Sequence, residues 1–328
     1  MNLFLAIDGG NSKTEVLLGD TSGAVLGFAR GAGSNHQTAG LDIAMSCLDD
    51  LVRTVREQAG PGAEARPVLV ATYLAGADFP VEYELLNEAI TTADWADKSI
   101  VDNDTFALLR AGTEAPNAVA VVCGAGTNCV GRAEDGRTVR FPSLGHLTGD
   151  WGGGQHLGSL TLWHAARAED GRAEPTALVD AVTHHFGYRA VANVAAAIHL
   201  GQLAHERIAE LTPILFTAAA AGDEVARSLV IRQGEEIATM ALAALRRLDL
   251  LTTPAAVVLG GGVLRSRDPI VFGALTERLT ASAPHAEITL VTAPPVLGAA
   301  LLALDTLGID GPAHDRLRAE VSQLAETP

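Results

Sequence analysis

Short apolar runs of strand length alternate with segments of helical period along the first third of the chain. The strand-like runs occupy residues 3–8, 14–20, 24–31, 66–76 and 98–104, and the helix-like segments occupy 41–60 and 83–96. Alternation of this kind predicts a mainly parallel sheet, and the glycine-rich turn after residue 8 predicts an antiparallel hairpin at one side of it.

A similar opening recurs roughly a hundred residues later. The segment 117–141 reads as an apolar strand, a glycine-rich turn, a short strand, an Asp-Gly turn and another strand. Two such hairpins indicate a duplicated architecture with two lobes. A chain of 328 residues also exceeds the roughly 100 to 200 residues of a usual single domain.

The rest of the chain elaborates the second lobe. Residues 158–251 are mostly Ala-rich and helical in pattern, whereas 255–262 and 287–292 are strand-like and 295–307 is helical. We predict a first lobe of residues 1–115, joined by a C-terminal helix at 312–328, and a second lobe of residues 116–311.

Composition excludes several classes of partner. The net charge of -16 opposes binding to nucleic acid or to an anionic membrane surface, because both depend on clustered Lys and Arg. No apolar stretch reaches the roughly 18 residues of a membrane span, and the N-terminus lacks a basic leader. We therefore expect a cytoplasmic protein. Cys47, Cys123 and Cys129 form no CxxC pair or zinc pattern.

The first glycine-rich turn, DGGNSKT, has the composition of an anion-binding loop. A Walker A loop needs a glycine directly before its lysine and a helix immediately after it, whereas a strand follows here. Backbone N–H groups of a turn between two strands can still bind phosphate, and Asp8 at the strand end favours a magnesium site beside it. A plain hairpin turn with solvated polar residues is the alternative.

Two later turns repeat this chemistry. CGAGTN opens the backbone at Gly124 and Gly126 and adds donors at Thr127 and Asn128, and LGGGV offers a flat surface without side chains at residues 260–262. Each turn alone is a weak signal. Two hairpins, one from each lobe, would bind a triphosphate between them.

The order of DGGNSKT, VDNDTFALLRAG, CGAGTN, GDWGGG and LGGGV resembles the sugar kinases of the actin, hexokinase and Hsp70 superfamily. More narrowly, it resembles the BadF/BadG ATPase family, which includes N-acetylglucosamine kinase. The resemblance spans Asp8 to about Leu304. It implies an α/β, two-lobed, actin-like ATPase fold of the ribonuclease H-like type, with duplicated mixed sheets flanked by helices.

The resemblance also implies a nucleotide site for MgATP. Both hairpins would bind phosphate, the glycines near residue 260 would bind adenosine, and Asp8 would hold Mg²⁺ directly or through water. The nucleotide residues implied are Gly9, Gly10, Asn11, Ser12, Lys13, Thr14, Gly124, Gly126, Thr127, Gly260, Gly261 and Gly262.

An aspartate at the end of the last strand of the first lobe is the family's general base, which implies Asp104. A carboxylate that accepts the hydroxyl proton suits phosphoryl transfer to an alcohol. Asp102 is the competitor, since residues two apart share one face of a strand. A helix N-cap is the alternative role for Asp104.

Sugar contacts are implied at positions between these loops, and three departures from the family pattern leave the substrate open. Trp151 replaces an acidic residue, and Ala125 and Ala75 replace hydroxyl-bearing residues. The substrate-binding residues implied are Asn35, His36, Asp78, Asp104, Asn128, Gly145 and Asp150.

The leading hypothesis is ATP-dependent phosphorylation of N-acetylglucosamine at its 6-hydroxyl, by a homodimer. Glucosamine, glucose and N-acetylmuramic acid are alternative acceptors. An ATPase that activates a dehydratase through an iron–sulfur cluster is a second class, and a non-catalytic sugar sensor is a third.

Overall fold

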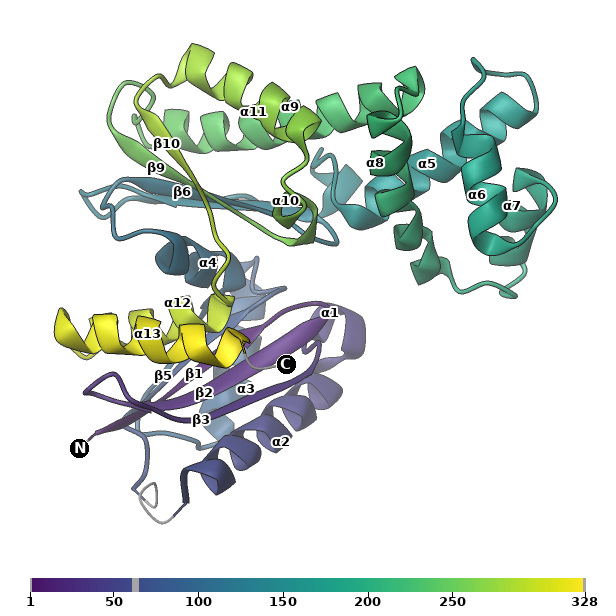
Figure 1. The fold of residues 1–328 in the computed structure, drawn as a ribbon. Helices are drawn as coiled ribbons and strands as arrows, with labels where there is room; N and C mark the ends of the chain where they lie inside the picture. Colours follow the sequence, from purple (N-terminus) through teal and green to yellow (C-terminus); the bar gives the residue numbers. More distant parts are fainter. Residues whose placement is uncertain (1, 61–64, 327–328) are drawn as a thin grey trace.

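The computed structural model of the protein describes residues 2–60 and 65–326 and contains two mixed five-stranded sheets (Figure 1). The first sheet has the order β3-β2-β1-β4-β5 and the second has the order β10-β9-β6-β7-β8. In each sheet a central strand pairs antiparallel with the next strand in sequence and parallel with a later one. The predicted duplication of mixed sheets is therefore confirmed.

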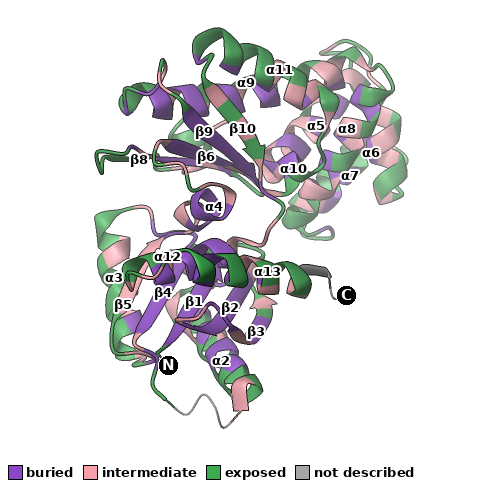
Figure 2. Ribbon diagram, turned by 60° about the vertical axis from the view of Figure 1, so that its left-hand side comes forward, coloured by how far each residue is buried: buried purple, intermediate pink, exposed green. Residues whose placement is uncertain are grey.

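The strands are short and mostly buried. Their bounds are β1 Leu3–Gly9, β2 Lys13–Asp20, β3 Val25–Ala32, β4 Leu69–Leu74, β5 Ser99–Asn103, β6 Ala118–Cys123, β7 Thr127–Arg132, β8 Thr138–Arg140, β9 Ala255–Gly260 and β10 Ala286–Leu290. All residues of β1, β4 and β9 are buried, because helices cover both faces of these central strands (Figure 2).

Helices flank both sheets. They are α1 His36–Ala39, α2 Leu41–Ala59, α3 Pro80–Thr92, α4 Asp104–Gly112, α5 Gly154–Glu169, α6 Leu178–Phe186, α7 Val191–His199, α8 Leu211–Ala220, α9 Glu224–Arg247, α10 Gly262–Arg265, α11 Pro269–Ser282, α12 Pro295–Thr306 and α13 Pro312–Glu326, with 3₁₀ turns at Gly145–Leu147 and His205–Glu210.

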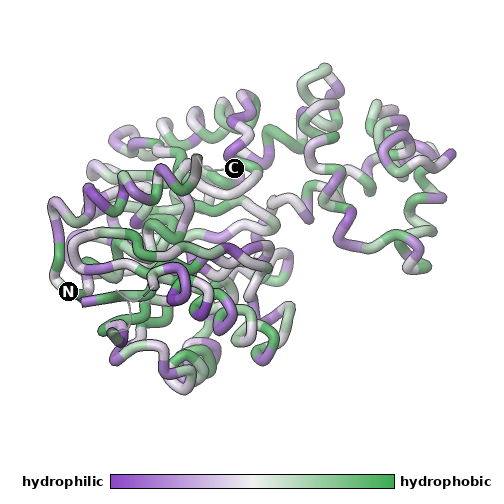
Figure 3. The backbone as a smooth tube through the Cα atoms, turned by 60° about the horizontal axis from the view of Figure 1, so that its bottom comes forward, coloured by the Kyte–Doolittle hydropathy of each residue, from purple (hydrophilic) through white to green (hydrophobic). Residues whose placement is uncertain are grey.

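Helices α2, α3 and α9 each pack against a sheet, whereas α5–α8 pack mainly on one another. In α2 the buried residues are Ala44, Leu48, Leu51, Val52 and Val55, which recur at helical spacing. The outer helices consequently alternate between hydrophilic and hydrophobic colours in Figure 3. No helix within residues 2–60 and 65–326 is long and apolar enough to cross a bilayer.

Helix α4 lies between the two sheets. Its main helical neighbour is α12, and it also contacts β6, β7 and β9 of the second sheet (Figure 2). Both α12 and α13 pack on the first sheet, where Leu301, Leu304 and Leu317 share a buried cluster with Phe4 and Leu17. The predicted lobe division remains a proposal, and a division that follows this packing would move α12 into the first lobe. Residues 327–328 of the predicted C-terminal helix lie outside the described residues.

The crossing of α4 and α12 requires a residue without a side chain. A Cβ atom added at Gly298 of α12 would lie 1.7 Å from the carbonyl oxygen of Ala107 in α4. The two helix backbones can approach this closely only because glycine has no Cβ.

We predict that Gly298→Ala lowers the free energy of unfolding by about 2 kcal/mol or more, because the added methyl group forces α12 away from α4. Gly273→Ala is the matched control, since Gly273 is exposed in α11 and its added Cβ meets no atom within 4 Å. The control should stabilise the protein by up to about 1 kcal/mol. Chemical denaturation measures both, and equal midpoints for Gly298→Ala and wild type would contradict the prediction.

Candidate active site

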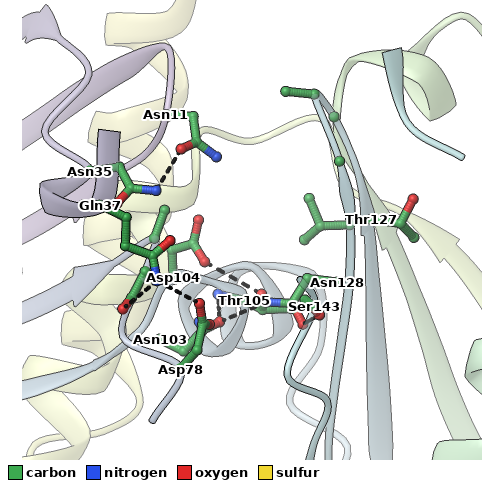
Figure 4. A pocket seen from close by; sticks show the side chains of 16 residues that line it. Asn11, Asn35, Gln37, Asp78, Asn103, Asp104, Thr105, Thr127, Asn128 and Ser143 are labelled. Atoms are coloured by element: carbon green, nitrogen blue, oxygen red, sulfur yellow. Dashed lines mark hydrogen bonds between the residues drawn. The ribbon is translucent and has the colours of Figure 1, made fainter. Parts of the chain in front are cut away.

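A polar cavity of about 150 Å³ lies where the first sheet meets the hairpin of the second (Figure 4). The walls come from the β1–β2 turn, α1, the segments after β4 and β5, and the β6–β7 hairpin. Amide and carboxyl side chains dominate the lining. The cavity is lined by Asn11, Asn35, Gln37, Ala75, Gly76, Asp78, Asn103, Asp104, Thr105, Val122, Gly124, Ala125, Gly126, Thr127, Asn128 and Ser143.

Hydrogen bonds between these side chains hold the lining in place. The Asn35 amide donates to Asn11 Oδ1 at 2.6 Å, and the Asn103 amide donates to Asp78 Oδ1 at 2.9 Å. On the opposite wall the Ser143 hydroxyl donates to Asn128 Oδ1 at 2.5 Å (Figure 4). Residues far apart in sequence therefore present a set of oriented donors and acceptors to the cavity.

Asp104 is the first residue of α4, and its neighbour Asn103 is the N-cap. The Asn103 Oδ1 accepts the backbone N–H of Thr105 at 3.0 Å, so the alternative N-cap role for Asp104 is wrong. The Asp104 carboxyl group lines the cavity instead. Burial, and secondarily the nearby Asp78, raise the pKa of Asp104 to about 6.

The Asp102 carboxyl group interacts with residues outside the cavity lining. Its carboxyl group forms an ion pair with Arg140 at 2.8 Å and accepts a hydrogen bond from the Tyr83 hydroxyl at 3.0 Å. The expected shared strand face of Asp102 and Asp104 is wrong, because β5 ends at Asn103 and Asp104 already belongs to a helix. Asp102 does not line the cavity.

Asp8 lies buried at the end of β1, directly opposite Glu15 in the β1–β2 register. Burial first, then Asp104 and Glu15, raise the pKa of Asp8 well above its usual value, while Lys13 and Arg265 lower it. Among the described residues no three His, Cys, Asp or Glu side chains converge to hold a metal. Glu15 is already paired with Lys13 and Arg30. The buried Asp8 carboxylate nevertheless fits Mg²⁺, which takes one or two carboxylates and fills its remaining positions with phosphate and water.

A second, less polar cavity of about 620 Å³ adjoins the first through Gly124 and Ala125, which line both. The predicted residues Ser12 and Gly262 line this second cavity. Sequence reasoning missed the wall formed by Ala209, Thr212, Pro213 and Phe216 of the helical insertion, and no motif marks these residues.

The first residues of α5 form hydrogen bonds with the turn of the β6–β7 hairpin, which lies between the two cavities. The backbone N–H groups of Gly154 and Gln155 donate to the carbonyl oxygens of Gly124 and Ala125 at 2.7 and 3.1 Å. The buried Gln233 side chain accepts from the Gly153 N–H at 3.1 Å. The loop backbone is thereby held over the positive end of a helix dipole, which favours an anion nearby.

Several predicted residues lie outside both cavity linings. Lys13 pairs with Glu15 at 2.8 Å, Thr14 donates to Ser34 at 2.8 Å, and His36 is largely buried with its Nε2 4.0 Å from Glu82. The guanidinium carbon of Arg232 lies over the Trp151 ring, 4.7 Å from the ring centroid. The predicted residues outside both linings are Asp8, Gly9, Gly10, Lys13, Thr14, His36, Gly145, Asp150, Gly260 and Gly261.

One of these outlying positions, Gly261, still shapes the site. A Cβ atom at Gly261, whose φ is 95°, would lie 2.3 Å from the carbonyl oxygen of Cys123, so only glycine allows β9 to end against the second hairpin. Gly145 and Asp150 bracket an exposed 3₁₀ turn, in which the Asp150 carboxyl accepts the Thr148 hydroxyl.

Comparison with known proteins places the chain in a family. Residues 5–303 match the BadF/BadG/BcrA/BcrD ATPase family. The chain belongs to this family. The resemblance inferred from the order of the loops is confirmed, and the remaining comparisons concern individual members and structures.

Two relatives of this family member have assigned activities. The N-acetyl-D-glucosamine kinase of Dictyostelium discoideum is 25% identical over 330 residues, covering 93% of this chain and 98% of the relative. The N-acetylmuramic acid/N-acetylglucosamine kinase of Clostridium acetobutylicum is 25% identical over 267 residues, covering 81% of this chain and 87% of the relative.

Solved structures confirm the actin-like sugar kinase fold. A candidate N-acetylglucosamine kinase from Chromobacterium violaceum aligns with a TM-score of 0.67 at 22% identity, covering 92% of this chain and 99% of that one. A ROK family glucokinase from Streptomyces griseus, solved with glucose and AMPPNP, aligns with a TM-score of 0.53 at 18% identity, covering 92% and 99%.

We predict that Asp104→Asn raises the melting temperature at about pH 8, and that this gain shrinks at about pH 5. With a folded pKa of about 6, above the usual 3.8, Asp104 is a half-buried carboxylate at pH 8 that destabilises the fold, and this penalty disappears as the group is protonated. Asparagine is neutral throughout.

Thermal unfolding at both pH values measures the effect. Asp94→Asn is the control, because Asp94 is exposed and its pKa is lowered by the hydrogen bond from Arg66. The control should show no gain at pH 8. A melting temperature for Asp104→Asn that is unchanged or lower at pH 8 would contradict the prediction.

Proposed function

We propose that the protein transfers the γ-phosphoryl group of MgATP to an amino sugar, with the 6-hydroxyl of N-acetylglucosamine as the first candidate acceptor. One observation carries the proposal: the Asp104 carboxyl lies in a cavity lined by amides, and this cavity shares the Gly124–Ala125 loop with a larger cavity beside it. An acceptor and a nucleotide bound on the two sides of that loop would meet there.

In the smaller cavity the sugar hydroxyls would exchange hydrogen bonds with Asn11, Asn35, Asn128 and Ser143. The Asp104 carboxylate would accept the proton of the attacking hydroxyl as its oxygen bonds to the γ-phosphorus and the bond to the ADP oxygen breaks. Positioning supplies much of the rate, because the reaction becomes effectively intramolecular.

The larger cavity suits the nucleotide. Phe216 and Pro213 would provide an apolar wall for the base, and the Ser12 side chain and the Ala125 backbone N–H would donate hydrogen bonds to phosphate. Magnesium held beside Asp8 would neutralise charge on the transferring phosphoryl group. The predicted roles of the other glycines, Lys13 and Thr14 remain proposals.

The named relatives support an amino sugar as acceptor. A coupled assay of ADP release across hexoses and hexosamines with MgATP tests this directly, and product analysis identifies the hydroxyl. Absence of turnover with every sugar would favour the sensor alternative. The homodimer and the cytoplasmic location remain predictions.

The iron–sulfur alternative is disfavoured by the cysteines. Cys123 and Cys129 are fully buried, and burial raises the pKa of Cys123 to about 11. Cluster ligation requires thiolates, which such burial opposes.

We expect Asp104→Asn to lower kcat by about 10²-fold to 10⁴-fold while the KM values for sugar and ATP change little, because only proton acceptance is lost. Asp102→Asn is the matched control, since Asp102 is two residues away but pairs with Arg140. Steady-state kinetics on both variants shows which of the two aspartates acts as the base. A comparable loss in the control, or none in Asp104→Asn, would reassign the base.

We expect Asp8→Ala to shift the magnesium concentration that gives half-maximal turnover upward by about tenfold or more, because a metal-binding carboxylate is lost. Titration of turnover with MgCl₂ at fixed ATP measures the shift. An unchanged magnesium dependence would make Asp8 a structural residue only.

A further inference from the structure

The smaller cavity carries negative charge and no positive charge, and we propose that this charge selects the acceptor sugar. Asp78 is the specificity-determining residue: it favours uncharged and ammonium-bearing hexosamines and rejects sugars that carry a carboxylate. The inference rests on the proposed kinase function, and it names the class of sugar that the same site accepts.

The charges of the lining are one-sided. Asp78 and Asp104 are its only charged members among the described residues, and every other polar side chain in it is a neutral amide or hydroxyl. Neutral side chains of this kind suit sugar hydroxyls. None of them can neutralise a carboxylate on the sugar.

Asp78 is held rigidly, with a second carboxylate behind it. Its Oδ1 accepts from the Asn103 amide at 2.9 Å, and its backbone N–H donates to Glu82 Oε2 at 3.0 Å. The Gln37 amide bonds Glu82 Oε1 at 2.6 Å and also reaches Asp78 Oδ2 at 3.4 Å. Burial and the charge of Glu82 raise the pKa of Asp78 to about 6, so Asp78 remains ionised at neutral pH.

Two of the nearby cations pair with carboxylates outside the lining, and Arg265, whose charge acts on Asp8, does not line the cavity. Arg140 pairs with Asp102 at 2.8 Å, and Lys13 pairs with Glu15 at 2.8 Å. The His36 ring lies beside Glu82, with its Nε2 4.0 Å from Oε1. Among the described residues, no lysine, arginine or histidine lines the cavity.

These charges decide between the candidate acceptors. N-acetylmuramic acid carries a carboxylate on its lactyl group, and a like charge placed against Asp78 in a desolvated site is repelled. The ammonium group of glucosamine would gain from the same charge. One relative is named for both N-acetylmuramic acid and N-acetylglucosamine, and we expect this chain to lack the first activity.

The test compares kcat/KM for glucosamine, N-acetylglucosamine and N-acetylmuramic acid with saturating MgATP at about pH 7. For the wild type we expect N-acetylmuramic acid to be at least about 100-fold poorer than N-acetylglucosamine. The uncharged carboxamide of N-acetylmuramic acid separates charge from size, and it should recover at least about tenfold of that loss.

Asp78→Asn should change two ratios of kcat/KM in opposite directions: that of N-acetylmuramic acid to N-acetylglucosamine and that of glucosamine to N-acetylglucosamine. Relative to N-acetylglucosamine, use of N-acetylmuramic acid should rise by about tenfold and use of glucosamine should fall by a similar factor. Asp102→Asn is the matched control, since it removes one charge outside the lining, and it should leave both ratios within about twofold. If Asp78→Asn does not fold, Glu82→Gln should shift both ratios in the same directions by smaller factors.

Three results would overturn the inference: wild-type use of N-acetylmuramic acid equal to that of N-acetylglucosamine, equal rejection of the acid and its carboxamide, or ratios in Asp78→Asn no different from those in Asp102→Asn. Failure of the proposed function is distinguishable, because no sugar would then be phosphorylated. Calorimetric binding of the same sugars would then test the charge selection without turnover.

Discussion

The close packing of α4 between the two sheets is the contact on which the site depends. Its backbone touches α12 at Gly298, and Leu108 fills the space left by Gly260 of β9. Because Asp104 is the first residue of this helix, the packing that joins the lobes also sets the position of its carboxylate. A shift of α4 would displace the candidate base relative to both hairpins, which explains why small residues occur at the crossing points.

Charge in the site opposes stability. The pKa values of Asp8, Asp78 and Asp104 are all raised, chiefly by burial, which means that the fold without ligand resists the ionised forms that the proposed chemistry uses. Carboxylates outside the site show the opposite shift. Asp94 and Glu210 accept hydrogen bonds from arginines, and these hydrogen bonds lower the pKa values of the two carboxyl groups. Asp78 and Asp104 line one cavity with no cation in its described lining, and carboxylates with raised pKa values gathered in this way are characteristic of a functional site.

The two cavities share one loop, the turn of the β6–β7 hairpin. The carbonyl oxygens of Gly124 and Ala125 accept hydrogen bonds from the first N–H groups of α5, and the Gln233 side chain accepts the N–H of Gly153, which precedes α5. A backbone fixed in this way can face a sugar on one side and phosphates on the other without side-chain adjustment.

The sequence by itself determined the duplicated sheets, the family and Asp104 as the candidate base, because hydrophobic period and loop order are local properties of the chain. Only the tertiary structure showed that Asp104 lines the cavity while Asp102 pairs with Arg140, since the end of β5 at Asn103 and the position of Arg140 depend on packing between segments far apart in sequence. The cavity wall at Thr212 and Phe216 was likewise invisible in the sequence, because helical spacing shows which face of a helix is apolar and not which cavity that face reaches. The pairing of Lys13 with Glu15 within β2, and the absence of a cation beside Asp78 in the described lining, depend on side-chain directions and loop packing that the sequence pattern does not show.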